Sequence, residues 1–298
     1  MNFKNILNDI SASEADESLS SRRHVLRSFG SKVALAALPF AIGSLFNKTY
    51  GQTGSKLIEA LNLALEIDYM QYNFYHIANN TGDLIPPSTF SGNNDTAGFR
   101  TIEQQQLAHI NFLKTTITAL GGVPFTPKNY NPLDVNPPFV PSAYDFTARK
   151  SSTYAPIFVN VFASYPKFLM LAQLLEDVAV KAYAWGMQDA LGNTTILTQM
   201  FQLQTTEARH AAHVRLMRRL PDVSAPETPS PWIVNNIPPT IPLQSYYLGE
   251  DNTIQNDISL TTLPGTGGSN VTKIGATAGF DEPITRAAAY AFIDPFRL

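Results

Sequence analysis

Two short segments, Glu207-Ala208-Arg209-His210 and Gln106-Leu107-Ala108-His109, constrain the fold more than any other part of the chain. Residues three positions apart lie about 60° apart on one face of an α-helix, so a Glu and a His at this spacing can reach one metal ion. Helix bundles that hold two metal ions use this pair on two helices and add one Glu from each of two others. The first segment has the pair intact, whereas Gln106 replaces the carboxylate of the second. The pattern predicts an all-α bundle with an altered metal site.

Four long segments have the apolar periodicity of amphipathic helices. We expect them at about residues 55–80, 96–120, 164–192 and 193–221. Gly121-Gly122 and Pro221 are typical of the residues that end helices. The segment 121–163 is rich in Pro, Tyr and Asn, and it can run the length of a 25-residue helix, about 37 Å. The order therefore predicts one long crossover between the second and third helices of a four-helix bundle.

The chain changes character after Pro221. Six prolines interrupt any long helix in the next segment: Pro226, Pro229, Pro231, Pro238, Pro239 and Pro242. A short helix is expected near the C-terminus, at about residues 284–293. We therefore expect the bundle to comprise residues 52–222 and residues 223–298 to form an irregular extension packed on it.

Composition restricts the chemistry. The chain has no cysteine, which excludes disulfides, thiolate metal ligands and cysteine catalysis. Any metal must bind oxygen and imidazole ligands, which suit iron, manganese or zinc. The net charge is −3, and no basic stripe remains after residue 51, so nucleic acid is not an expected partner.

The N-terminal segment has the pattern of an export signal. Ser21-Arg22-Arg23-His24-Val25-Leu26-Arg27 resembles the twin-arginine motif, and an apolar run follows at residues 33–46. That run is short for a membrane span but suits a signal peptide. Thr49 and Gly51 are small residues before a cleavage point at Gln52. We expect residues 1–51 to be a signal read by the twin-arginine machinery, and the mature protein to be periplasmic or extracellular with no membrane span.

The candidate metal ligands come from all four predicted helices. Glu66 and Glu176 each lie within an apolar run, where a carboxylate is costly to bury unless it is paired or binds a metal. The candidate set is Glu66, Gln106, His109, Glu176, Glu207 and His210. A Glu-x-x-His pair alone is common by chance, but this order on four successive helices is much more specific.

The sequence also resembles a known family. Residues 175–183 and 207–213 are similar to the ferritin-like domain of the desiccation-related-protein type, and so are Gly121-Gly122-Val123-Pro124, Ala143-Tyr144-Asp145-Phe146 and Phe280-Asp281-Glu282-Pro283. The resemblance covers roughly residues 55–296. It implies a ferritin-like four-helix bundle and a two-metal site at the candidate set. It implies no defined reaction.

Gln106 leaves three states of the site open. An amide oxygen can bind a metal but carries no charge, so three carboxylates would face two divalent ions. Glu103 is about 120° away from His109 around the helix, and Gln105 is another amide. The site could hold two metals completed by hydroxide, one metal on Glu176, Glu207 and His210, or no metal in a polar core.

Two functions are consistent with this pattern. The first is an exported redox protein that uses one or two Fe or Mn ions to react with oxygen or peroxide. The second is a non-catalytic envelope protein, connected with stress or structure, that keeps the bundle without functional metal. Whether the protein is an enzyme and whether it forms a homo-oligomer are left open by the sequence.

Overall fold

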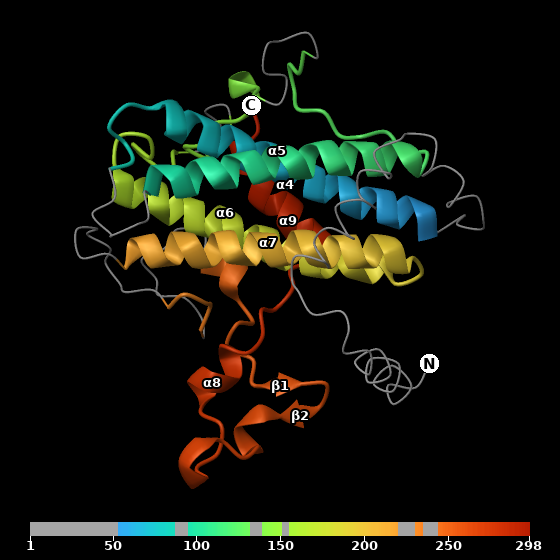
Figure 1. Ribbon diagram of the computed structural model, residues 1–298, viewed down its shortest axis with the longest axis vertical. Coiled ribbons are helices and arrows are strands. Elements are labelled where there is room, and N and C mark those ends of the chain that lie inside the picture. Colours follow the sequence, from blue (N-terminus) through green and yellow to red (C-terminus); the bar gives the residue numbers. More distant parts are fainter. Residues whose placement is uncertain (1–52, 87–94, 132–138, 151–154, 220–229, 235–243) are drawn as a thin grey trace, which may run out of the picture. The chain divides into compact units, whose positions relative to one another are not determined.

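Four long α-helices pack side by side in the computed structural model (Figure 1). They are α4 (Thr53–Asn80), α5 (Asp95–Ala119), α6 (Tyr165–Gly186) and α7 (Thr194–Arg218). The pairs α4/α5 and α6/α7 form the two most extensive interfaces, and α4 also packs on α6. The all-α bundle with a long connection after its second helix is therefore confirmed.

The structure describes residues 53–86, 95–131, 139–150, 155–219, 230–234 and 244–298. Residues 50–298 belong to one structural unit. The predicted signal peptide, residues 1–51, lies outside the described residues. No helix within the described ranges is long and apolar enough to cross a membrane.

The helix ends follow local sequence signals. Gly121 adopts a φ of +78° directly after α5, and Gly122 donates its N–H to the carbonyl of Ile117 at 2.9 Å. The side chain of Asn193 accepts a hydrogen bond from the Ile196 N–H at 3.1 Å and starts α7. The third helix differs from its predicted extent, because it ends at Gly186 and a 3-10 turn, η2 (Met187–Ala190), continues the chain.

The bundle core is built from large apolar side chains on all four helices. Residues with 1% exposure or less include Leu61, Leu65, Phe74, Leu113, Phe168, Leu171, Leu175, Val178 and Val214. Burying one such side chain contributes about 1.5–3 kcal/mol to folding. Several polar and charged side chains lie buried within this apolar core, among them Glu176, Glu207 and His210.

The C-terminal region covers the bundle in part. The predicted short helix is present as α9 (Arg286–Ile293), which packs on α4 and α6 and buries Phe292 and Ile293. Beyond it, η6 (Asp294–Phe296) buries Phe296, and the Leu298 N–H donates to the Ala143 carbonyl at 3.0 Å.

A small hairpin precedes α9 and was not predicted. Its strands are β1 (Ile254–Gln255) and β2 (Ile258–Ser259), which pair antiparallel. Asn256 and Asp257 between them have φ values of 49° and 65°, as a two-residue turn of this kind requires. The remaining short elements are η1 (Pro141–Ala143), η3 (Gln244–Tyr247), η4 (Leu260–Thr262), η5 (Thr266–Gly268) and α8 (Lys273–Thr277).

Candidate metal centre

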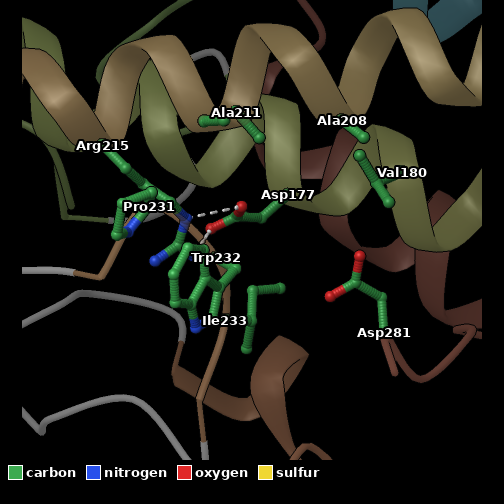
Figure 2. A pocket seen from close by; sticks show the side chains of 10 residues that line it. Asp177, Val180, Ala208, Ala211, Arg215, Pro231, Trp232, Ile233 and Asp281 are labelled. Atoms are coloured by element: carbon green, nitrogen blue, oxygen red, sulfur yellow. Dashed lines mark hydrogen bonds and ion pairs between the residues drawn. The ribbon is translucent and has the colours of Figure 1, made fainter. Parts of the chain in front are cut away.

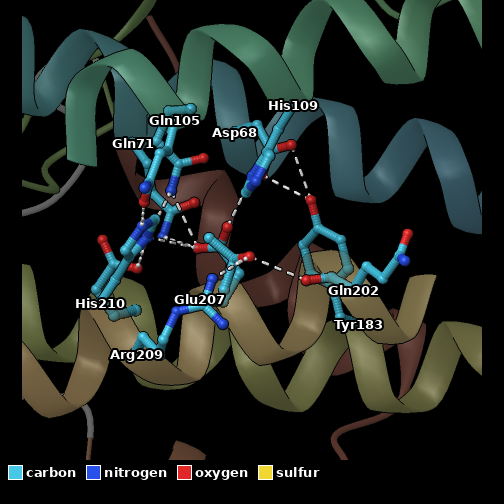
Figure 3. Close-up of polar contacts among 12 residues, drawn as sticks. Asp68, Gln71, Gln105, His109, Tyr183, Gln202, Glu207, Arg209 and His210 are labelled. Atoms are coloured by element: carbon cyan, nitrogen blue, oxygen red, sulfur yellow. Dashed lines mark hydrogen bonds and ion pairs between the residues drawn. The ribbon is translucent and has the colours of Figure 1, made fainter. Parts of the chain in front are cut away.

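Glu207 is the central residue of a buried polar cluster inside the bundle (Figure 3). Its Oε2 accepts hydrogen bonds from Gln106 Nε2 at 3.0 Å and from Gln71 Nε2 at 3.4 Å. Its Oε1 lies 3.0 Å from His109 Nδ1. The Glu207 carboxylate therefore connects α4, α5 and α7, although no atom of it reaches solvent.

The imidazole of His210 is oriented from both sides. Its Nε2 lies 2.6 Å from Gln105 Oε1, which can only accept, so this nitrogen carries the hydrogen. Its Nδ1 faces the carboxylates, 3.5 Å from Glu176 Oε2 and 3.6 Å from Glu207 Oε2. When His210 is neutral, Nδ1 is the nitrogen that carries the lone pair, and it points at the two acids and lies 3.5 Å from Gln106 Nε2.

Two tyrosine hydroxyls complete the cluster. Tyr75 donates a 2.6 Å hydrogen bond to Glu176 Oε1, which leaves Glu176 Oε2 directed at His210. Tyr183 lies 2.8 Å from both carboxyl oxygens of Asp68. Both phenol rings are buried, so these hydrogen bonds hold the two acids in one orientation each.

The ligand atoms form two groups that share one residue. Glu176, Glu207 and His210 make the first group, and Asp68, His109 and Glu207 make the second. In each group the candidate ligand atoms lie within 4.8 Å of one another, and all five residues are buried. Three carboxyl groups and two imidazoles are thus concentrated at one level of the bundle.

Five of the six predicted residues come together here: Gln106, His109, Glu176, Glu207 and His210. The structure does not bring Glu66 to them. Its carboxylate instead pairs with the Arg297 guanidinium at 2.7 and 2.8 Å. Two residues correspond to about 200° around a helix, so Glu66 and Asp68 lie on nearly opposite sides of α4.

Neither substitute considered for Gln106 supplies a ligand. Glu103 contacts His76 Nδ1 at 2.6 Å and accepts a 2.7 Å hydrogen bond from Asn79, both on α4. Gln105 contacts His210 on the nitrogen that faces away from the acids. Gln105 thus acts on the orientation of a ligand, and Glu103 is part of a separate contact between α4 and α5.

Sequence reasoning missed Asp68 and Gln71. Both are fully buried on α4, at the same three-residue spacing as Gln106/His109 and Glu207/His210. The repeated three-residue spacing was the sequence pattern that could have identified them. Asp68 lies in the same apolar run as Glu66. With Gln71 and Gln106 both present, two of the four helices direct an amide at Glu207.

Charge in the cluster is concentrated on Glu207 and the two histidines. Burial by itself would raise the pKa of Glu207, but His210 and His109 lower it well below its ordinary value. Burial lowers the pKa of His210, yet the Glu207 and Glu176 carboxyls outweigh this and raise it to about 10. The pKa of His109 is raised in the same way, mainly by Glu207 against the effect of burial.

The other two acids retain their protons more strongly. Burial raises the pKa of Glu176 to about 8, with a further contribution from Glu207 and a partial offset by His210. Burial also raises the pKa of Asp68 well above its ordinary value, and His109 only partly opposes this. Without metal, the centre is therefore rich in protons that a cation would have to displace.

The residues fit a bound cation. The buried Oε1 atoms of Gln71 and Gln106 accept no hydrogen bond from any described residue, although an unsatisfied buried acceptor costs about 1–3 kcal/mol. Carboxylate oxygens, amide oxygens and imidazole nitrogens are suitable ligands for iron and manganese. Glu176, Glu207 and His210 would hold such an ion in one group, and Asp68, His109 and Glu207 in the other.

The fold and site together define a class, the four-helix bundles that direct carboxylates and histidines inward from facing helices. A family model described as a ferritin-like domain matches residues 56–219, which is more than half of the chain. The protein belongs to this ferritin-like domain family. A comparison with curated proteins finds no match.

Proposed function

We propose that this protein is an exported, metal-dependent redox protein of the desiccation-related type of ferritin-like proteins. The observation that carries the proposal is the pair of buried ligand groups that share Glu207. Five ionisable side chains are costly to bury in a core, and buried ionisable groups with shifted pKa values cluster at functional sites. Iron or manganese, when bound, would supply one-electron redox chemistry toward oxygen or peroxide.

The group Glu176, Glu207 and His210 is the better prepared of the two. Gln105 already holds His210 with Nδ1 toward the acids, as an outer partner of a metal-binding histidine does. Asp68, in contrast, accepts the Tyr183 hydroxyl hydrogen bond on both of its oxygens. We therefore assign the tighter site to Glu176, Glu207 and His210, and a weaker second site to Asp68 and His109.

Protons must leave before a cation can bind. Glu176 and Asp68 have raised pKa values, and His210 and His109 bind a proton more tightly than a free imidazole. Tyr75 and Tyr183 donate to the two acids and can keep donating after those acids ionise. Metal uptake should therefore release protons and become tighter as pH rises.

Export through the twin-arginine route is part of the proposal. It is supported by Ser21-Arg22-Arg23 and the apolar run at residues 33–46. The test is the location of the full-length protein in cells that have or lack twin-arginine translocation. A matched pair of variants, Arg22→Lys/Arg23→Lys and Arg149→Lys, separates a motif effect from a general loss of arginine. Normal export of the first variant would remove the twin-arginine assignment.

A second function is favoured by one observation. The amide N–H groups of Gln71 and Gln106 both donate to Glu207, so the chain partly satisfies this carboxylate without a metal. A stress or structural protein of the envelope would need only this metal-free bundle. Fe(II) oxidation and peroxide consumption by the purified full-length protein decide between the two. Turnover that Glu207→Gln abolishes supports the redox function, and activity equal to buffer in the presence of bound metal supports the scaffold.

A further inference from the structure

A surface pocket lies beside α6 and α7, where the segment 230–234 and the C-terminal region meet these helices (Figure 2). Its volume is about 230 Å³, and its walls include Val180, Ala208 and Ala211. Trp232, with 55% of its surface exposed, lines the pocket together with Asp281. No ligand of the candidate metal centre contributes to its lining.

The charged groups around this pocket leave one acid without a partner. Arg215 forms an ion pair with Asp177, and Lys181 forms one with Glu250. The carboxylate of Asp281 makes no hydrogen bond or ion pair to any residue in the described part of the chain. Although the residue as a whole is exposed, the loss of solvent around its carboxyl in the pocket and the charge of Asp177 raise its pKa, while Arg215 and Lys181 lower it.

The same arrangement disfavours an anionic ligand. Arg215 is the basic residue that lines the pocket, and its guanidinium is already engaged by the Asp177 carboxylate and the Ser230 carbonyl. Tyr247 directs its hydroxyl to Asp177 as well, at 2.6 Å. An anion would therefore compete with the Asp177 carboxylate for Arg215, whereas a cation would meet the Asp281 carboxylate.

The volume of the pocket and the side chains that line it restrict the class of ligand further. Pockets for drug-sized ligands usually start at about 300 Å³, so this one suits a smaller group. The side chains of Val180, Ala211 and Trp232 offer contact to a short aliphatic chain, and the Asp281 carboxylate is the group that a cationic head would meet. We propose that this pocket binds an alkylammonium group, with the charge at Asp281 and the aliphatic part against Trp232 and Ala211.

An alkylammonium group can come from a free amine or from a lysine side chain. The probes are therefore n-butylammonium and N-acetyl-lysine amide, titrated against the full-length protein by ligand-observed NMR, with n-butanol as the uncharged control. At least one ammonium probe should bind saturably and more tightly than butanol. Binding of only one of the two assigns the source without changing the chemistry.

Variants connect the binding to the two residues. Asp281→Asn and Trp232→Ala should each raise the dissociation constant about three- to fivefold, because the first removes an exposed charge contact and the second removes part of the apolar wall. Asp257→Asn removes another exposed acid, on the β1–β2 turn, and should leave binding unchanged. Trp232→Phe keeps an aromatic ring and should lose less than Trp232→Ala.

Three results would overturn the proposal. They are no saturable binding of either ammonium probe, equal binding of butanol, and equal weakening by Asp281→Asn and Asp257→Asn. Circular dichroism of each variant shows whether the fold is kept. If Trp232→Ala alone loses its fold, Asp281→Asn and Trp232→Phe still decide the outcome.

Discussion

Gln106 Nε2 donates a 3.0 Å hydrogen bond to Glu207 Oε2, so the amide that stands in for an expected carboxylate holds the central acid of the site. A carboxylate at position 106 would instead place a second negative charge beside Glu207 in a buried setting. The amide thus stabilises the metal-free bundle, and the same substitution removes one charge that would balance bound cations. Stability without metal and affinity for metal are opposed at this residue.

Replacing Gln106 with Glu tests that opposition. Gln106→Glu should destabilise the metal-free protein by about 1–3 kcal/mol, because two acids must share one buried position. Saturating Mn(II) should restore most of the loss and raise the number of ions bound per chain. Urea unfolding with and without Mn(II) measures both effects. Gln104→Glu, at an exposed position of α5, is the matched control. Equal stability of the two variants without metal would contradict this account.

Gln105 should control metal affinity although it contributes no ligand. Its Oε1 fixes His210 through Nε2, so Gln105→Ala frees the ring to rotate. Loss of such an outer partner typically weakens metal binding about 10- to 100-fold. Competition titrations with a metal indicator provide the dissociation constants, and Gln104→Ala controls for the loss of an amide on the same helix. Unchanged affinity in Gln105→Ala would show that Gln105 does not control metal binding through His210.

Asp68 and Glu66 should behave differently although they lie two residues apart. Asp68→Asn should lower the metal stoichiometry, since Asp68 belongs to the second ligand group. Glu66→Gln should leave stoichiometry unchanged and reduce stability, because Arg297 loses the carboxylate that it contacts at 2.7 Å. Elemental analysis and urea unfolding of both variants check the assignment. A drop in metal content in Glu66→Gln alone would return Glu66 to the ligand set.

Stability of the metal-free protein should fall as pH rises from about 6 to 9. His210 has a pKa of about 10 in the folded chain against an ordinary value of 6.5, so its stabilising contribution is complete below 6.5 and is lost as pH rises through 10. Glu176, with a folded pKa of about 8, loses its contribution as pH rises through that value. The expected loss exceeds about 1 kcal/mol, the free energy of roughly one pKa unit.

Urea unfolding at pH 6 and pH 9 in the presence of a chelator measures this slope. His210→Gln should flatten this slope, because it removes the imidazole whose pKa is raised to about 10. Excess Mn(II) should reverse the trend, since metal binds the deprotonated ligands. A metal-free protein that becomes more stable between pH 6 and pH 9 would be inconsistent with the burial of these groups.

The four-helix bundle could be predicted from the sequence because the patterns that mark each helix lie within that helix or at its ends. Apolar periodicity, Gly121 and Asn193 mark the helices without knowledge of their partners. The direction in which a side chain points depends on contacts with residues that are distant in the sequence. Glu66 and Asp68 lie in one apolar run, and only the packing of α4 against α5 and α6 decides which of them meets His109. Arg297, the partner of Glu66, is 231 positions away and left no pattern in the sequence.

Short elements with weak patterns were also beyond the sequence. The β1–β2 hairpin has only two residues in each strand, so it shows no alternation to recognise. The turn sequence Asn256-Asp257 is only a moderate indication of a hairpin. The structure shows that both residues adopt positive φ values. The 3-10 turn η2, which continues the chain after α6 ends at Gly186, contacts α7, which follows it closely, and also α4, which is distant in the chain.

The most direct test of the central claim is the metal content of the full-length protein after loading with Fe(II) or Mn(II) under oxygen-free conditions, measured by elemental analysis with exchange into chelated buffer. The account predicts about one tightly held ion per chain, lost in Glu207→Gln and retained in Glu103→Gln, whose carboxylate lies outside the cluster. A metal content near zero in the unaltered chain, or equal content in both variants, would contradict it.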